Sequence, residues 1–245
     1  MSMRKAMAKN VKISVIIPTL NEEKSIEACL RSLKDQSYKT FEIIVVDGGS
    51  TDATVEKAKK YTRNVIVAHK TTVGAARNVA AKKSTAEILA FTDADTIVPK
   101  NWLERIVENF SAWGVVAVGG VWKPLRQRPL DNVMFKINSD LWYRLTALFG
   151  FYQLGTPNCA YKRDVFLAAG GFNEGLAMLE DTELSLRIKN YGKVMIDKNL
   201  YVHTSARRFK QEGYLKVLVR YLKAYFNLFR GRKVTLKHFD IIRHE

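Results

Sequence analysis

The feature that most constrains this chain is a regular alternation of short apolar runs and amphipathic segments in its first hundred residues. The apolar runs have the length of buried strands and fall at residues 13–17, 42–46, 64–68 and 88–91. The first segment between them has apolar residues at helical spacing, namely Ile26, Cys29, Leu30 and Leu33. Strands that alternate with helices through short connections predict an α/β fold, with a mostly parallel central sheet covered by helices.

The second half of the chain is less regular, but it shows no sign of a domain boundary. We expect a strand at 115–121, a helix over 131–150, and two short strands at 193–197 and 200–203. No linker rich in Pro, Gly or Ser separates these segments from the first half. The chain is therefore expected to have these parts: a flexible basic tail (1–10), two halves of one domain (11–98 and 99–205), and a basic amphipathic helical extension (206–245).

Two aspartates, Asp93 and Asp95, follow the apolar run at 88–91. Because strand residues alternate sides, both carboxylates should emerge on the same side at the end of the sheet where α/β proteins bind ligands. Carboxylates there suit a hard divalent cation that keeps part of its coordination for substrate phosphates. The alternative is a solvated strand end, and the pair alone does not decide between the two.

A second acidic pair, Glu180 and Asp181, stands at the start of an expected helix. One of these carboxylates could accept a proton from an attacking hydroxyl, although acids are also favoured in a first helical turn for electrostatic reasons. Further along, His203 could complete a metal site, since neutral imidazole binds manganese. A lone histidine at a strand end is also simply explained as a hydrogen-bonded residue.

Several polar residues are candidates for holding a phosphorylated ligand. Asp47 ends the second strand and could bind a base or ribose, or it could cap the glycine-rich turn that follows. Arg77 should lie in the first turn of a helix that opens at Gly74, where free backbone N–H groups favour a phosphate; a surface ion pair is the alternative. Arg207 and Arg208 could hold a pyrophosphate or a lipid phosphate, or form a solvated basic loop.

The charge balance implies anionic partners. Lys and Arg number 40 against 24 Asp and Glu, which gives a net charge of +16, and residues 206–245 contain eleven basic and three acidic residues. No recognisable nucleic-acid module accompanies this charge. The extension has a helical apolar face that could lie in an anionic membrane interface, or pack on the domain or on a second subunit in a homodimer: Leu215, Leu218, Val219, Leu222, Tyr225, Phe226 and Phe229.

The compartment is suggested by what the sequence leaves out. Cys29 and Cys159 lie in apolar surroundings and are expected to be buried thiols without a disulfide. No apolar run is long enough to span a membrane, and the first residues lack the apolar core of a signal peptide. We therefore expect a cytoplasmic protein that could bind the membrane surface peripherally.

In their order, these pieces resemble the family 2 glycosyltransferases, which have the GT-A fold. The resemblance covers roughly residues 11–205 and rests on six motifs: Val15-Ile-Ile-Pro-Thr-Leu-Asn-Glu22, Ile44-Val-Val-Asp-Gly-Gly-Ser-Thr-Asp52, Gly74-Ala-Ala-Arg-Asn78, Phe91-Thr-Asp-Ala-Asp95, Gly170-Gly-Phe172 and Glu180-Asp181. The segment from His203 to Phe209 and the helix after it resemble, more loosely, non-processive members that act near membranes.

The resemblance implies inverting transfer of a sugar from a nucleoside diphosphate, with UDP expected before GDP and with Mn²⁺ or Mg²⁺ as cofactor. The acceptor would be a hydroxyl of a glycan or of a lipid-linked molecule. Residues 11–98 would bind the nucleotide sugar and 99–205 the acceptor. Carried onto this chain, the family roles are these: Pro18, Thr19, Glu22, Asp47, Arg77, Asp93, Arg207 and Arg208 for the donor, Asp95 and His203 for the metal, and Asp181 as general base with Glu180 beside it.

The sequence departs from the family pattern at two points, and two other functions are possible alternatives. Gly48 stands where many members carry a second Asp, and the Gln-x-x-Arg-Trp motif of processive synthases is absent, which argues against repeated polymer extension. A haloacid-dehalogenase-like phosphatase could use Asp93 as its nucleophile, although about three strand–helix units would then precede the nucleophile without a role. A non-enzymatic basic protein that binds membranes is the second rival.

Overall fold

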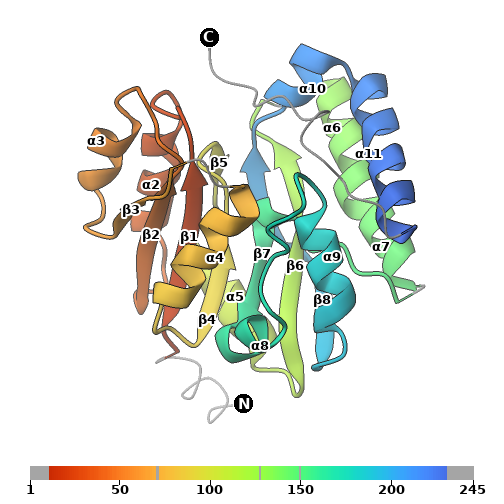
Figure 1. Cartoon of the computed structure of the whole chain (residues 1–245), viewed down its shortest axis with the longest axis horizontal. Coiled ribbons are helices and arrows are strands. Elements are labelled where there is room, and N and C mark those ends of the chain that lie inside the picture. The colour runs from red at the N-terminus through yellow and green to blue at the C-terminus, as the bar shows by residue number, and fades with distance from the viewer. Residues whose placement is uncertain (1–10, 70–71, 127, 149, 231–245) are drawn as a thin grey trace.

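The computed structural model describes residues 11–69, 72–126, 128–148 and 150–230. The predicted tail at 1–10 and the last part of the extension, 231–245, lie outside these described residues. The described chain forms one eight-stranded sheet in the order β3-β2-β1-β4-β7-β6-β8-β5, with helices on both faces (Figure 1). Four of the seven neighbouring strand pairs are parallel and three are antiparallel. The predicted α/β class with a mostly parallel sheet is confirmed.

The first half is a run of parallel strands joined by helices, as the alternating pattern predicted. Its elements are β1 (Ile13–Thr19), α2 (Ile26–Lys34), β2 (Phe41–Asp47), α3 (Thr54–Lys59), β3 (Val65–Val67), α4 (Val73–Lys83) and β4 (Ile88–Phe91). The side chains of β1 alternate between two apolar clusters, one on each face of the sheet. Val15 and Ile17 pack with Leu30 of α2, whereas Ile16 packs with Ala80 of α4. This layering leaves the carboxyl ends of β1, β2 and β4 at one shared edge.

The second half completes the same sheet. Its elements are β5 (Thr96–Ile97), α5 (Trp102–Phe110), β6 (Val115–Pro124), the 3₁₀ turn η2 (Thr156–Asn158), β7 (Cys159–Lys162), α8 (Arg163–Ala168), α9 (Glu180–Ile188) and β8 (Lys193–Thr204). Strand β7 lies between β4 and β6 and is antiparallel to both, while β6 and β8 are parallel. Helix α5 lies in a stretch to which the sequence analysis assigned no element.

The two strands predicted at 193–197 and 200–203 are one continuous strand, β8, so that prediction was wrong. Its pairing with β6 is irregular between Gly120 and Val121. The buried side chain of Asn158 fills the irregularity: its amide donates to the carbonyls of Val121 (3.1 Å) and Leu200 (2.9 Å). A side-chain amide thus replaces the ladder hydrogen bonds that the irregularity removes.

The helix predicted over 131–150 is present but is not a uniform α-helix. It consists of α6 (Pro129–Phe135), a π-helical turn η1 (Lys136–Leu141) and α7 (Trp142–Leu148). The extension is likewise two helices, α10 (Arg207–Glu212) and α11 (Tyr214–Phe229), because Gly213 between them has a φ of +85°. Helix α11 lies beside α6 and α7 along one edge of the molecule (Figure 1).

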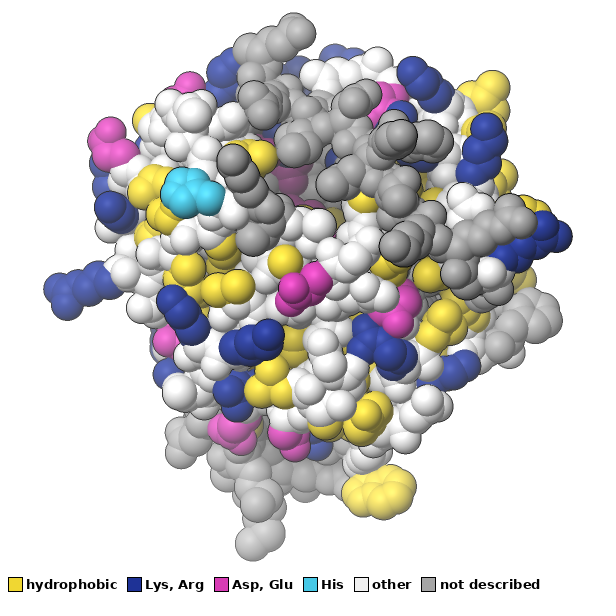
Figure 2. Space-filling model, in the orientation of Figure 1, with side chains coloured by type: hydrophobic (Ala, Val, Ile, Leu, Met, Phe, Trp, Pro, Cys, Tyr) yellow, Lys and Arg dark blue, Asp and Glu magenta, His cyan; other side chains and the backbone are white. Residues whose placement is uncertain are grey.

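Helix α11 packs on the domain through a different face from the one predicted. Val217 and Ala224 are buried, and Ala224 belongs to an apolar cluster with Leu176, Met178 and Leu179. Of the seven residues predicted to form the apolar face, Tyr225 packs against this cluster and the side chain of Phe229 lies outside the described part. The other five are exposed: Leu215, Leu218, Val219, Leu222 and Phe226. Hydrophobic and basic side chains lie together along this edge (Figure 2).

Two expectations about the whole chain can be compared with the described part. Cys29 and Cys159 are fully buried and are not joined in a disulfide. Burial raises the pKa of both thiols well above the usual value. Among the described helices, none combines the length and the apolar character needed to cross a bilayer.

Candidate active site

The candidate site lies at the carboxyl edge of β1, β2 and β4, where the loops after these strands meet the start of α9. Here the two aspartates after β4 have different partners. The Asp93 carboxylate pairs with the Arg77 guanidinium at 2.8 Å, whereas the Asp95 carboxylate lies 3.3 Å from the guanidinium of Arg207. Thr204, at the end of β8, also contacts Asp95 through its hydroxyl at 3.5 Å. Each aspartate is therefore charge-compensated by its own arginine.

Arg77 connects the two acidic pairs. One guanidinium nitrogen contacts Asp93 and another contacts Glu180, both at 2.8 Å, and only 3% of the arginine side chain is exposed. Burial opposes the charge of Arg77, but the two carboxylates outweigh that effect and raise its pKa. The sequence placed Arg77 in the first helical turn, facing a phosphate; it instead lies in the second turn of α4, with both carboxylate contacts inside the protein. A direct contact with a phosphate stays a prediction.

Asp181 is held by backbone N–H groups at the start of α9. Its carboxylate accepts hydrogen bonds from Thr182 N–H at 2.6 Å and from Thr156 N–H at 3.2 Å. Burial, together with the neighbouring carboxylate of Glu180, raises the pKa of Asp181 to about 7. A carboxylate with a pKa near the working pH is well matched to accept a proton from a hydroxyl.

The residue before the acidic pair has an unusual backbone conformation. Leu179 has a φ of +63°, in the left-handed region that a leucine rarely adopts. Its side chain is fixed in the cluster with Ala224 of α11. Strained backbone of this kind persists where the surrounding structure determines it, and such positions cluster at functional sites. The packing of α11 therefore supports the conformation that presents Glu180 and Asp181.

Glu22, Asp95 and Arg207 form a second charged group. Arg207 contacts both carboxylate oxygens of Glu22 as well as Asp95. Burial raises the pKa of Asp95 to about 7; Arg207 counteracts this shift, and Asp93 and Glu22 add to it. Glu22 and Asp95 thus share the guanidinium of Arg207, while Asp93 is paired with Arg77. This donor set fits Mg²⁺ or Mn²⁺, which bind through one or two carboxylates and complete their coordination with water and substrate phosphates.

The structure does not bring His203 to Asp95. Its ring packs edge-on against Tyr201, with centroids 5.7 Å apart, and its Nδ1 lies 3.5 Å from the carbonyl oxygen of Pro124. The next residue, Thr204, is the one whose side chain faces Asp95, because neighbouring strand residues point to opposite sides. Among the described residues, no group of three or more His, Cys, Asp and Glu side chains is close enough to hold a metal. The metal role of His203 stays a prediction.

The two donor candidates Asp47 and Thr19 differ in their hydrogen bonding. The carboxylate of Asp47 accepts hydrogen bonds from Gly49 N–H and Ser50 N–H (2.9 and 2.8 Å) and from the Ser50 hydroxyl (2.5 Å), so it caps its own turn. By contrast, the buried hydroxyl of Thr19 has no hydrogen-bond partner in the described chain. The role of Thr19 towards a nucleotide stays a prediction. Pro18 lies on β1 opposite Val46.

The remaining candidate, Arg208, is half-buried on α10 next to Arg207. Thr156, Tyr221 and Tyr225 also lie near Asp181, although none of them was predicted as a site residue. The two tyrosines lie close enough to Asp181 for its charge to contribute to raising their pKa, after burial. A Gly-Thr-Pro turn and two tyrosines four residues apart carry no distinctive signal, so only the three-dimensional packing reveals them.

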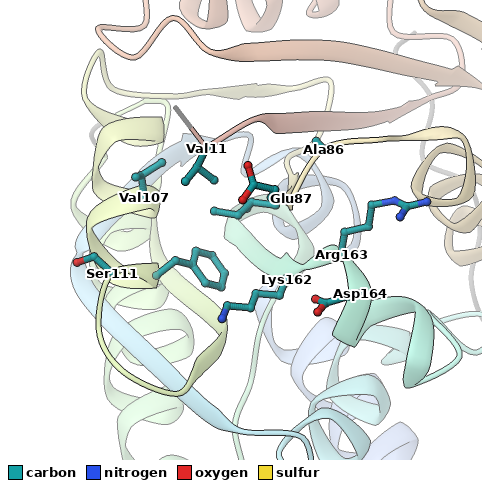
Figure 3. Close-up of a pocket in the computed structure, with 10 residues that line it drawn as sticks. Val11, Ala86, Glu87, Val107, Ser111, Lys162, Arg163 and Asp164 are labelled. Carbon is teal, nitrogen blue, oxygen red and sulfur yellow. The ribbon is translucent and has the colours of Figure 1, made fainter. Parts of the chain in front are cut away.

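A separate cavity of about 650 Å³ opens at the opposite edge of the sheet (Figure 3). Val11, Val107 and Phe110 line it, and Lys162 and Arg163 lie at its border. These residues are near the amino ends of β1 and β4, so the cavity is distinct from the site around Asp95 and Asp181. None of the candidate site residues lines it.

The chain is similar in sequence to known glycosyltransferases. Residues 14–165 match the model of "Glycosyl transferase family 2". The chain is 41% identical over 226 residues to poly(ribitol-phosphate) beta-N-acetylglucosaminyltransferase TarS of Staphylococcus aureus, covering 83% of this chain and 36% of that protein. It is 29% identical over 243 residues to the succinoglycan biosynthesis protein ExoA of Rhizobium meliloti, covering 91% of this chain and 70% of that protein. The chain spans about a third of the length of TarS and of glycosyltransferase AglE from Haloferax volcanii (38%).

Solved structures with the same fold include two with a bound nucleotide sugar. Residues 1–349 of S. aureus TarS, in complex with UDP-GlcNAc, superpose with a TM-score of 0.63 and 26% identity, over 80% of this chain and 59% of that one. Mannosyltransferase PcManGT from Pyrobaculum calidifontis, in complex with GDP-Man and Mn²⁺, gives a TM-score of 0.66 over 87% and 65%; at 22% identity it shows the fold alone. Because the family model matches more than half of the chain, the chain belongs to glycosyl transferase family 2.

Proposed function

We propose that the chain transfers a sugar, with inversion at the anomeric carbon, from a nucleoside-diphosphate sugar to a hydroxyl of a glycan or lipid-linked acceptor. The observation that carries this proposal is the position of Arg77, which contacts both Asp93 and Glu180. It brings the acidic pair after β4, suited to a metal and a diphosphate, next to the acidic pair at α9, suited to proton transfer.

Asp181 is the general base of this reaction. Its carboxylate accepts the proton of the acceptor hydroxyl while that oxygen attacks the anomeric carbon from the face opposite the leaving group. The new glycosidic bond forms as the bond from the anomeric carbon to the phosphate oxygen breaks, and the nucleoside diphosphate leaves with the electron pair. Glu180 holds Arg77 and raises the pKa of Asp181, so it acts as a positioning residue.

The donor side is assigned to residues of the first half and of α10. Pro18, Thr19 and Asp47, at the ends of β1 and β2, are assigned to the nucleotide. Asp95 would hold the cation, with Asp93 assigned to the nucleotide, and His203 would join only if its ring left Tyr201. The cation, when bound, neutralises charge on the leaving diphosphate. Arg207 and Arg208 contribute positive charge at the same place, and Glu22 anchors Arg207.

A UDP-linked donor is favoured by the relationship to TarS, whose structure contains UDP-GlcNAc. The phosphatase alternative, with Asp93 as nucleophile, is less favoured because Asp93 is engaged by the buried guanidinium of Arg77. Three parallel strands also precede β4, and the phosphatase alternative gives these strands no role.

A thermal-shift panel of nucleotide sugars, with and without Mn²⁺, tests the proposal. A UDP-sugar with Mn²⁺ should raise the melting temperature, because a ligand at a hundredfold excess over its dissociation constant stabilises the folded state by about 2.7 kcal/mol. A melting temperature that no nucleotide sugar raises, with or without Mn²⁺, would count against the proposal. Release of phosphate from an aryl phosphate, abolished by Asp93→Asn, would restore the phosphatase alternative.

A further inference from the structure

Exposed apolar side chains are concentrated on two neighbouring helical segments. Of the eighteen large hydrophobic side chains that are exposed in the described chain, twelve lie on α6–η1–α7 or α11. We name these twelve the α7–α11 surface: Leu130, Val133, Ile137, Leu141, Trp142, Leu145, Leu148, Leu215, Leu218, Val219, Leu222 and Phe226. Single exposed apolar residues are ordinary, but a concentration of this kind marks an interaction site.

The two apolar stripes meet where the helices touch. Near one end of the helix pair, the Tyr214 hydroxyl of α11 contacts the Asp131 carboxylate of α6. Near the other end, Trp142 of α7, which is 37% exposed, packs against Tyr225 of α11 with ring centroids 6.5 Å apart. The helices therefore lie side by side along their length (Figure 1). Their exposed apolar residues form one surface rather than two separate ridges.

The exposed charges on these helices are all positive within the described chain. Lys216, Lys223 and Arg230 are exposed and recur every seven residues, which places them on one side of α11 beside the apolar stripe. No acidic side chain described on α6, η1, α7, α10 or α11 is exposed, and Asp140 of η1 is half-buried. Asp131 is buried against Tyr214, and Glu212 pairs with Arg220. The surface thus combines apolar side chains with an exposed basic row (Figure 2).

We propose that the α7–α11 surface docks on a lipid bilayer that contains anionic head groups. Leucine and phenylalanine side chains enter the boundary between head groups and acyl chains, while the lysines extend their charged ends towards the head groups. Each basic residue near such a surface adds attraction. A second copy of this chain fits less well, because a symmetric contact would place the same basic rows against each other.

This inference stands apart from the proposed transfer reaction, since it uses none of the site residues. Its experiment is flotation of the full chain with vesicles of phosphatidylcholine, alone or mixed with phosphatidylglycerol. The chain should float with the anionic vesicles, bind the neutral ones far more weakly, and lose binding as salt is raised.

Two paired substitutions test the apolar and basic parts separately. Leu141→Ser with Leu222→Ser should lower the partition coefficient at least about tenfold, since both side chains lose contact with the acyl region. Lys216→Glu with Lys223→Glu should lower it at least about twentyfold, because each lost lysine alone accounts for about fivefold. Matched controls lie elsewhere on the surface: the exposed Trp113→Ser and the exposed pair Lys82→Glu with Lys83→Glu should float like the unmodified chain.

Circular dichroism melting of every variant checks that it is folded. If the leucine double variant unfolds, the lysine double variant still tests the proposal, because both lysines are exposed. The proposal is overturned if the chain binds anionic and neutral vesicles equally. It is also overturned if the control variants reduce flotation and the two paired variants do not. A third result would overturn it too: light scattering shows a dimer that the two leucine substitutions dissociate, and the unmodified chain does not bind vesicles.

Discussion

Arg77 and Glu180, 103 positions apart in the chain, form an ion pair of 2.8 Å in which the side chains are 3% and 8% exposed. The pair joins the helix after β3 to the start of α9, and the same guanidinium also holds Asp93. Removing one member of a buried pair leaves the other charge without compensation, which is the costly case for buried ions.

Arg77→Ala should therefore lower the free energy of unfolding by about 3–5 kcal/mol. Urea denaturation measures the loss. Arg31→Ala is the control, because Arg31 pairs with Glu27 at 3.9 Å on the surface, where such a pair contributes about 0–1 kcal/mol. A loss of similar size in both variants would show that the Arg77 contacts are not buried in solution.

Asp181→Asn should reduce the rate of transfer by about 10²–10⁴-fold, because the amide cannot accept the proton of the acceptor hydroxyl. Binding of the nucleotide sugar should be unchanged, since the proposed role of Asp181 is towards the acceptor. Rates with a radiolabelled donor and calorimetric binding of the same donor separate the two effects. Asp164→Asn, an exposed residue on α8, should leave both quantities as they are; full activity of Asp181→Asn would remove the assignment of the base.

Transfer should depend on pH through the same carboxylate. The pKa of Asp181 is raised to about 7, so the protonated and inactive form predominates below that value and the base is ionised above it. We expect kcat/KM to rise with pH and to level off above about 7. Glu180→Gln should shift the midpoint to lower pH, because the Glu180 charge is one cause of the raised pKa. A profile that is flat from pH 5 to 8 would contradict the role of Asp181.

Asp95→Ala should remove the dependence of nucleotide-sugar binding on Mn²⁺, since Asp95 is the carboxylate assigned to the cation. Calorimetry with and without Mn²⁺ checks this directly and requires no transfer activity. His203→Ala is the informative companion: lower affinity for Mn²⁺ would make His203 a ligand, whereas unchanged affinity would leave it packed against Tyr201 as in this structure.

Two glycines should differ sharply when each is replaced by alanine. A Cβ at Gly120 would lie 2.1 Å from the carbonyl oxygen of Leu200 and 2.2 Å from the amide nitrogen of Asn158, so Gly120→Ala should cost about 3 kcal/mol or more. At Gly114 a Cβ meets nothing within 4 Å, and only its φ of +76° is unfavourable, at about 1–2 kcal/mol. Equal losses in urea denaturation would mean that the strand irregularity relaxes around the new methyl group.

The sequence predicted the first half well because local pattern and tertiary structure agree there. Residues 13–17, 43–46 and 88–91 are buried in the sheet, and strands covered on both faces appear in the sequence as nearly uninterrupted hydrophobic segments. The prediction was weaker where pairing is irregular. The break that suggested two strands in β8 is an irregularity completed by Asn158, a residue some forty positions earlier in the chain.

Motifs in the sequence select the candidate residues of the site but not their contacts. The identities of Asp93, Asp95, Glu180 and Asp181 follow from motifs, yet the contact of Arg77 with two carboxylates depends on how α4 and α9 pack. Periodicity likewise found an apolar face on α11 without showing that the domain uses the neighbouring face. Ala224 packs against Leu176, Met178 and Leu179 before α9, and Val217 is also buried, so this side of α11 faces the domain.

The place of β7 in the sheet has a consequence for dissecting the chain. The halves predicted at 11–98 and 99–205 are contiguous in sequence, but β7 lies between β4 and β6. A fragment ending near residue 98 would leave one edge of β4 without its neighbour, and an uncovered apolar edge strand invites aggregation. The first half is thus not expected to fold as a separate unit: a fragment that ends at residue 98 should be insoluble, whereas one that extends through Lys162 includes the strand that covers β4.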